Sequence, residues 1–202
     1  MAVVDKPSAR ETKRLQTRER LMGAAIAEFK RAGMAEADVG AIVAAAGVAH
    51  GTFFFHFPTK EHVLLELEQR EEERIAKQLA RSTGAKHDLS STLSEAVRLV
   101  MGLERRLGAV LFKDFLALHF SQTRPPAEDA RDHALVVLLA QQIEHVRERG
   151  DLDPEVNALN SAVFFLLGLY ALAITTNEPL RGELISDHVK RTLRSMAVPG
   201  RI

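Results

Sequence analysis

The segment VGAIVAAAGVAHGTFFFHFPTK, residues 39–60, constrains the fold of this 202-residue chain more than any other. It holds a short apolar stretch, a glycine, a second short stretch and the start of another helix at Pro58-Thr59. Small residues at Ala46 and Gly47 let two short helices cross closely, since glycine adopts backbone conformations that other residues resist. This layout is typical of a helix-turn-helix, whose second helix can enter the major groove of DNA.

Apolar residues recur at helical spacing along most of the chain, and strand-like alternation is scarce. Leu21, Ala25 and Phe29 form one face of a helix that Gly33 ends, and Asp38 is the expected N-cap of the next helix. The expected helices cover about residues 11–31, 39–46, 49–55, 59–81, 88–106, 108–121, 127–149, 154–176 and 181–197. The sequence therefore predicts an all-α protein of about nine helices.

Charge and helix layout together predict two domains. The chain carries 27 Lys/Arg and 27 Asp/Glu, so its net charge is zero. Residues 1–60 hold nine Lys/Arg and six Asp/Glu, which is the sign expected for a surface that faces DNA. We expect residues 1–60 to form a helix-turn-helix domain with a basic N-terminal arm, and residues 61–202 to form a second helical domain.

Composition argues against several other classes of protein. The chain has no cysteine, which excludes a disulfide framework and favours a cytoplasmic location. Its N-terminus lacks the apolar core of a signal peptide. The longest apolar run, residues 162–174, is shorter than the ~20 residues that span a bilayer, so we expect a buried core helix and no membrane partner.

Several positions in the first domain can contact DNA. Gly51 lets the backbone approach closely, and the Thr52 hydroxyl can reach a phosphate. Lys60 lies near a helix N-terminus, which attracts phosphate. The candidate DNA-binding residues are Arg14, Ala49, His50, Gly51, Thr52, Phe54, His56 and Lys60, with Lys6, Arg10 and Lys13 as further basic residues of the arm. Of Phe53, Phe54, Phe55 and Phe57, at least two are expected in the core.

The pieces RERLMGAAIAEFKRAG and IVAAAGVAHGTFFFHFPTKEHVL resemble the DNA-binding domain of TetR-family transcriptional regulators. Members typically show A-G-V-S-K-G-T-[LF]-Y-x-[HY]-F-x-[SN]-K, where this chain has AGVAHGTFFFHFPTK. The resemblance implies a repressor that a small hydrophobic effector releases from a palindromic operator in double-stranded DNA. It also implies an effector pocket among the fourth to seventh helices and a homodimer formed by the last two.

Three departures from that pattern keep a second interpretation open. Ala49 stands where the family usually has a capping serine, His50 replaces the usual lysine or polar residue, and Phe54 replaces a tyrosine whose hydroxyl commonly contacts phosphate. The DNA-reading face is therefore short of hydrogen-bonding groups. The alternative function is a homodimeric ligand-sensing or protein-interaction module with weak or lost DNA binding.

The second domain offers candidates for a pocket and for a dimer face. Its apolar and aromatic residues suit a hydrophobic ligand. The candidate pocket residues are Met101, Glu104, Phe112, Phe115, His119, Leu138, Gln141, Phe164 and Tyr170. The helix expected over residues 154–176 is apolar nearly all round in its second half, so we expect a partner subunit to cover part of it. Gly168 and Ala171 would allow close approach there.

Nothing in the sequence indicates catalysis. No nucleophile and base pair emerges from the motifs. Asp129, Asp132 and His133 have a spacing that a metal ion could use, but acids at a helix N-terminus are favoured by the helix dipole alone. We expect a protein that is not an enzyme and has no cofactor and no metal site.

Overall fold

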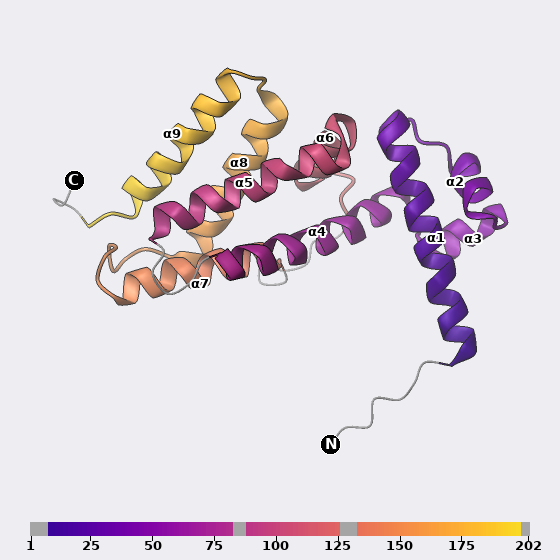
Figure 1. The fold of residues 1–202 in the computed structure, drawn as a ribbon, viewed down its shortest axis with the longest axis horizontal. Helices are drawn as coiled ribbons and strands as arrows, with labels where there is room; N and C mark the ends of the chain where they lie inside the picture. Colours follow the sequence, from indigo (N-terminus) through magenta and orange to yellow (C-terminus); the bar gives the residue numbers. More distant parts are fainter. Residues whose placement is uncertain (1–7, 83–87, 126–132, 199–202) are drawn as a thin grey trace. The chain divides into compact units, whose positions relative to one another are not determined.

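The computed structural model describes residues 8–82, 88–125 and 133–198. These residues form nine α-helices and one short 3-10 helix and contain no strand, so the predicted all-α fold is confirmed (Figure 1). The elements are α1 (Ala9–Ala32), α2 (Val39–Ala46), α3 (His50–His56), α4 (Lys60–Ser82), α5 (Leu89–Leu107), α6 (Ala109–Ala117), η1 (Leu118–Phe120), α7 (Ala134–Glu148), α8 (Ala158–Thr175) and α9 (Leu180–Ser195). The chain divides into two compact units, residues 1–64 and 65–202, and the division falls within α4.

The N-terminal unit is built on the buried face of α1. Leu21, Ala25 and Phe29 are fully buried on this face, as their spacing predicted. Helix α2 packs against α1, and α3 packs against α2. Asp38 caps α2 as predicted, since its carboxylate accepts the amide hydrogens of Gly40 at 2.8 Å and Ala41 at 3.1 Å.

A left-handed glycine makes the turn between α2 and α3. Gly47 has φ 64° and ψ 44°, a conformation that costs energy for residues with a side chain. The next amide, that of Val48, donates to the carbonyl of Val43 at 3.0 Å and closes the end of α2. The axes of α2 and α3 then meet at 96°, which is the steep crossing of a helix-turn-helix.

Lys60 at the start of α4 holds the loop that precedes α2. Its Nζ donates to the carbonyl of Ala35 at 2.8 Å and to that of Ala37 at 3.2 Å. These two bonds satisfy loop carbonyls and tie the loop to the beginning of α4. Lys60 is therefore part of the scaffold of the N-terminal unit, whatever else it contacts.

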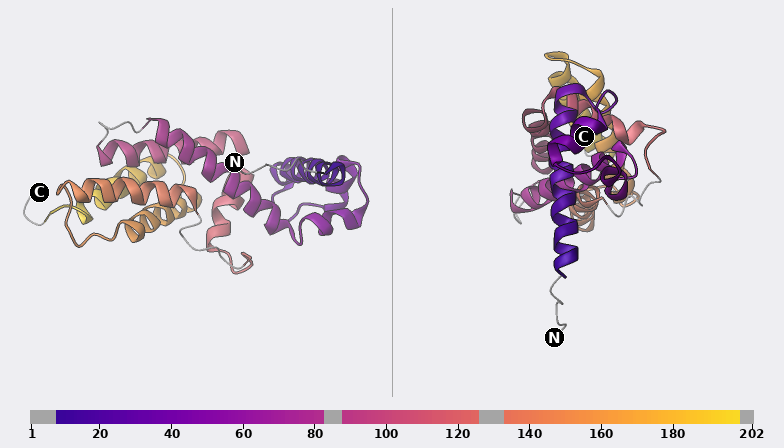
Figure 2. Two further views of the ribbon diagram at one scale, coloured as in Figure 1. Left: turned by 90° about the horizontal axis from the view of Figure 1, so that it is seen from below. Right: turned by 90° about the vertical axis from the view of Figure 1, so that its right-hand side faces the viewer.

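The C-terminal unit is a layered helical body. Helix α8 packs against α7 on one side and α9 on the other, and α5 contacts α6, α7 and α9. The views in Figures 1 and 2 show α7, α8 and α9 side by side. By length and composition α8 could also cross a membrane, as could α2 and α3 taken as one bent segment, but α8 is packed here as a core helix.

The contact between α8 and α9 depends on the absence of a side chain at Gly168. The ring of His188 lies over this glycine and stacks on Phe165 with an interplanar angle of 3°. His188 Nε2 also lies 2.9 Å from the carbonyl oxygen of Phe165. The close approach expected at Gly168 is thus used by α9 of the same chain.

Three predicted helices differ from the structure at their ends. Asn157, rather than Asp153, caps α8 by accepting the amide hydrogen of Asn160 at 2.9 Å. Asp153 accepts from the amide of Glu155 instead and forms a turn. The helix expected over 108–121 is divided into α6 and η1. The helix expected over 127–149 corresponds to α7 within the described residues.

Replacing Lys60 with alanine should destabilise the N-terminal unit. The variant loses two hydrogen bonds from a charged donor, so the free energy of unfolding should fall by about 1–2 kcal/mol. Urea denaturation followed by circular dichroism measures it. Lys13→Ala, at an exposed position of α1, is the control, and equal stability of the two variants would contradict the assignment.

Gly168→Ala should destabilise the packing of α8 on α9. The new Cβ would lie 2.5 Å from Cε1 and 2.8 Å from Nε2 of His188, and such overpacking costs about 1–3 kcal/mol. Gly102→Ala on α5 is the matched control, because no heavy atom lies within 4 Å of its Cβ position. The midpoint of thermal unfolding should be lower for Gly168→Ala than for Gly102→Ala. Equal midpoints would show that the close contact between Gly168 and His188 is unimportant for stability.

Candidate functional site

Helix α3 presents one face to solvent and one to the core. Phe53 and Phe57 are fully buried, whereas Phe54 is 48 % and Phe55 is 74 % exposed. At least two of the four phenylalanines therefore lie in the core, as predicted. His50 and Gly51 share the exposed side of the helix with Phe54 and Phe55. Phe55 was not among the predicted contacts, although its place midway between Phe53 and Phe57, which are one helical turn apart, could have indicated that it lies on the opposite side of the helix.

The beginning of α3 has no side-chain cap. Ala49 occupies the N-cap position with φ −71° and ψ 150°, and no side chain accepts a hydrogen bond from the first turn there. The amide of Thr52 donates to the Ala49 carbonyl at 2.9 Å. Free amide groups at this end of α3 remain available to an acceptor such as a phosphate oxygen.

His56 does not lie on the exposed face, which corrects its prediction as a DNA contact. Its side chain is buried, and its carbonyl accepts a hydrogen bond from Arg18. The Arg18 guanidinium also lies 4.2 Å from the ring centroid of Phe57. Burial, and then the positive charges of Arg18 and Arg14, lower the pKa of His56.

The remaining predicted DNA contacts differ in what they can offer. Arg14 is exposed on α1, and Thr52 is half-buried. Lys60 uses two of its three N–H donors on the carbonyls of Ala35 and Ala37, which leaves one for a phosphate. Lys6 lies outside the described residues.

A groove of about 650 Å³ lies between α5 and α9 in the C-terminal unit. Its apolar lining comes from Val97, Met101, Ile185, Val189 and Leu193. Its charged lining comes from Arg98, Arg105, Arg181, Lys190, Glu104 and Glu178. Arg181 is held by Glu104 at 3.1 Å and by Glu178 at 3.0 Å. The groove therefore combines an apolar surface with an excess of basic side chains.

The structure does not bring the nine predicted pocket residues into one cavity. Met101 and Glu104 line the groove, but Phe112 and Phe115 are buried core residues of α6. Phe164 is 70 % exposed and is not among the residues that line the groove. Two others lie on α7, where Leu138 is half-buried and Gln141 is exposed. The last two, His119 and Tyr170, belong to a separate polar cluster.

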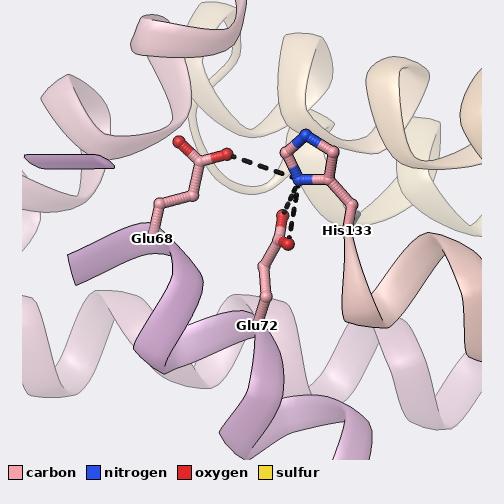
Figure 3. Close-up of side chains that lie close together, drawn as sticks. All are labelled: Glu68, Glu72 and His133. Atoms are coloured by element: carbon pink, nitrogen blue, oxygen red, sulfur yellow. Dashed lines mark hydrogen bonds and ion pairs between the residues drawn. The ribbon is translucent and has the colours of Figure 1, made fainter. Parts of the chain in front are cut away.

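This buried polar cluster gathers around two glutamates of α4. Glu68 and Glu72 are one helical turn apart, so both carboxylates leave the same face of the helix. Both are buried, and Nδ1 of His133, at the N-terminus of α7, faces both carboxylates (Figure 3). Its Nδ1 is 3.0 Å from Glu72 Oε2 and 3.8 Å from Glu68 Oε1.

Side chains from other elements complete the cluster. Arg124 donates two parallel hydrogen bonds of 2.9 Å to the carboxylate of Glu68. His119 Nε2 lies 3.0 Å from Glu68 Oε1 and 3.9 Å from Glu72 Oε1. The ring of Tyr170 lies 4.7 Å from that of His119, measured between centroids. His119 Nδ1 is buried and has no hydrogen-bond partner among the described residues.

These contacts set the charges in the cluster. Burial raises the pKa of Glu68, but hydrogen bonds from His119 and Arg124 outweigh it and lower that pKa to about 2. Burial lowers the pKa of His119, yet its bonds to Glu68 and Glu72 raise it to about 9. The bond to Glu72 raises the pKa of His133, and burial raises that of Tyr170 well above its ordinary value. Two buried carboxylates therefore stay ionised among cationic partners.

Sequence reasoning missed Glu68, Glu72 and Arg124. The two glutamates fall in the run EQREEER, residues 68–74, which has the composition of a solvated helix face. Their four-residue spacing, with Ile75 and Leu79 continuing the same buried side of α4, was the available signal. Asp129 and Asp132, considered earlier as partners of His133, lie outside the described residues.

Known proteins resemble this chain in both of its units. The family model described as bacterial regulatory proteins, tetR family, matches residues 21–67, which include α2, α3 and the start of α4. FadR of Thermus thermophilus, a TetR-family transcriptional repressor solved with lauroyl-CoA, shares 24% identity at a TM-score of 0.67 over 88% of this chain and 91% of its own.

A second repressor has the same fold. SmeT, the repressor of the Stenotrophomonas maltophilia multidrug efflux pump SmeDEF, is 21% identical at a TM-score of 0.60, over 92% of this chain and 94% of its own. A SmeT complex with triclosan matches at 20% identity and a TM-score of 0.56, over 91% and 93% of the two chains. Residues 21–67 therefore match the model of the tetR family of bacterial regulatory proteins, and the chain shares the fold of solved TetR-family regulators.

Proposed function

We propose that this protein is a ligand-responsive transcriptional regulator that acts as a repressor and leaves its operator when a small hydrophobic effector binds. The observation that carries the proposal is the exposed face of α3 at the end of a helix-turn-helix. A helix presented in this way can enter the major groove while the preceding helix supports it. We expect a cytoplasmic protein without enzymatic activity.

The exposed face of α3 suits apolar readout of DNA. Ala49, Phe54 and Phe55 offer methyl and aromatic surface, which can contact the methyl groups of thymine in the major groove. Phosphate contacts would come from the backbone around Gly51 and from Arg14, since such contacts fix position without reading sequence. A face of this kind predicts an operator with thymines at the contacted positions.

The partly exposed apolar side of α8 supports a homodimer. Phe164, Leu167, Ala171 and Ile174 recur at helical spacing, and none of them is fully buried. An apolar stripe with an aromatic ring 70 % exposed favours cover by a second copy of the same helix. A two-fold dimer would present two α3 helices and so require a palindromic operator.

The groove between α5 and α9 is our candidate effector site. Its apolar lining suits a hydrophobic ligand, and its basic side chains suit one with an anionic group. FadR has been solved with lauroyl-CoA and SmeT with triclosan, and both of these ligands have an apolar part, which supports the proposal. Helix α4 continues from one unit into the other. A ligand that prefers one conformation of the C-terminal unit can therefore shift the DNA-binding units of the dimer.

One observation favours the alternative of a ligand-sensing or protein-interaction dimer with weak or lost DNA binding. Helix α3 lacks a side-chain cap at Ala49, and its exposed ring at Phe54 has no hydroxyl. The missing cap costs about 1 kcal/mol of helix stability. This alternative predicts a dimer with no salt-sensitive affinity for DNA.

Gly51→Ala should weaken DNA binding without damaging the fold. No heavy atom lies within 4 Å of its Cβ position, and alanine favours a helix more than glycine. On DNA the methyl group would meet the phosphate backbone, so we expect about tenfold weaker binding, or about 1.4 kcal/mol. Fluorescence anisotropy with operator DNA measures it. Gly23→Ala, equally open on α1, should bind as wild type, and equal affinity of both variants would refute the contact.

Phe164→Arg should convert the dimer to a monomer. The substitution places a charge in the apolar stripe of α8, where a second copy would bury it without a partner. Light scattering coupled to size exclusion reports the mass. Val110→Arg, at a 49 % exposed apolar position of α6, should leave the dimer intact. A wild-type monomer, or a dimeric Phe164→Arg variant, would contradict the proposed face.

A further inference from the structure

We propose that Glu68, Glu72, His119 and His133 form a binding site for one divalent transition-metal ion of the Zn²⁺ type. These four side chains lie in the core of the C-terminal unit, apart from the groove between α5 and α9. The inference does not depend on DNA binding, because its test measures the binding of a metal ion to the protein.

The donor types fit such an ion. Two carboxylates and two imidazoles are hard to borderline ligands, which suit Zn²⁺ and its neighbours better than Ca²⁺ or Mg²⁺. Glu68 and Glu72 come from adjacent turns of α4, His119 from η1 and His133 from the N-terminus of α7. Ligands from separate elements can surround an ion.

The distances between donor atoms also fit. A tetrahedral ion with bonds of about 2.1 Å holds its ligand atoms about 3.4 Å apart. His133 Nδ1 lies 3.0 Å from Glu72 Oε2 and 3.8 Å from Glu68 Oε1. One ligand atom from each of Glu68, Glu72 and His133 lies within 4.8 Å of the others. Figure 3 shows the two carboxylates directed toward the ring of His133.

His119 supplies the fourth donor. Its Nε2 lies 3.0 Å from Glu68 Oε1 and 3.9 Å from Glu72 Oε1. The group whose donor atoms all lie within 4.8 Å of one another holds Glu68, Glu72 and His133, so the ring of His119 would turn toward the ion on binding. Nδ1 on the other edge of the ring has no hydrogen-bond partner among the described residues, so none of them opposes a small rotation of the ring toward an ion by a hydrogen bond there.

Charge and burial support a cation in this place. The side chains of Glu68 and Glu72 are 2 % and 8 % exposed, so water screens their charges little. Arg124 already balances one of the two carboxylates, so a divalent ion would replace the protons that the two imidazoles release when they become its ligands. Arg124 would remain hydrogen-bonded to Glu68 and orient it, as partners behind metal ligands commonly do.

The test uses untagged full-length protein, treated with EDTA and then freed of chelator. Isothermal titration with ZnCl₂ should show one ion bound per chain, and MgCl₂ should show none. Co²⁺ should give the intense visible absorption of a tetrahedral site with mixed oxygen and nitrogen ligands. The metal should also raise the midpoint of thermal unfolding, because it binds the folded state.

Two matched variants locate the ion. Glu72→Gln keeps the size of the side chain but removes a ligand charge, and Zn²⁺ affinity should fall at least about tenfold. Glu73→Gln, the next residue on the exposed side of α4, should bind as wild type. If circular dichroism shows that the Glu72→Gln variant is unfolded, His133→Ala is tested in its place, because the side chain of His133 is less buried than that of Glu72.

Specific results would overturn the proposal. One is the absence of stoichiometric Zn²⁺ binding by the wild-type protein. Another is equal affinity in wild type and in the folded Glu72→Gln or His133→Ala variant, which would place the ion on surface histidines. Failure of DNA binding alone would leave this site unaffected, so the two proposals are judged separately.

Discussion

The C-terminal unit depends on two ionised carboxylates that α4 carries into its core. Glu68 and Glu72 remain charged only because Arg124, His119 and His133 surround them. Those partners come from η1 and the segment directly after it and from the start of α7, so the cluster joins two later parts of the chain to α4. Removing one partner from such a buried group costs about 3–5 kcal/mol, because it leaves an uncompensated charge. The packing of the surrounding apolar residues has to be compatible with this arrangement.

The N-terminal unit is held together by shorter-range contacts. Asp38 caps α2, Gly47 turns the chain, and Lys60 holds the loop before α2. Each contact uses backbone groups that a helix end or a loop leaves unpaired. The result is a rigid support for α3. The exposed face of α3 is mostly apolar. Recognition of DNA by such a face would rely on methyl contacts and on phosphate contacts made by the backbone and by α1.

Local signals explain what could be predicted from the sequence. The Asp38 cap and Gly47 placed α2 correctly, and the spacing of Leu21, Ala25 and Phe29 gave the buried face of α1. Burial of His56 was not predictable, because it depends on Arg18 packing over Phe57 from another helix.

In the body, the pairing of Glu68 with Arg124 joins residues far apart in the sequence, and a charged run gives no sign of it. Likewise, no local pattern distinguishes a groove between α5 and α9 from a pocket among α4 to α7. Exposure of Phe164 follows only from which side of α8 meets α7 and α9.

The most direct measurement is the affinity of the pure protein for DNA from upstream of its own coding region. Fluorescence anisotropy at two salt concentrations, with scrambled DNA of equal length as the control, gives both specificity and salt dependence. The account predicts tighter binding to the native fragment and a negative slope of log affinity against log salt, because phosphate contacts release counterions. Equal, salt-insensitive binding to both DNAs, or none at low salt, would contradict a DNA-binding regulator.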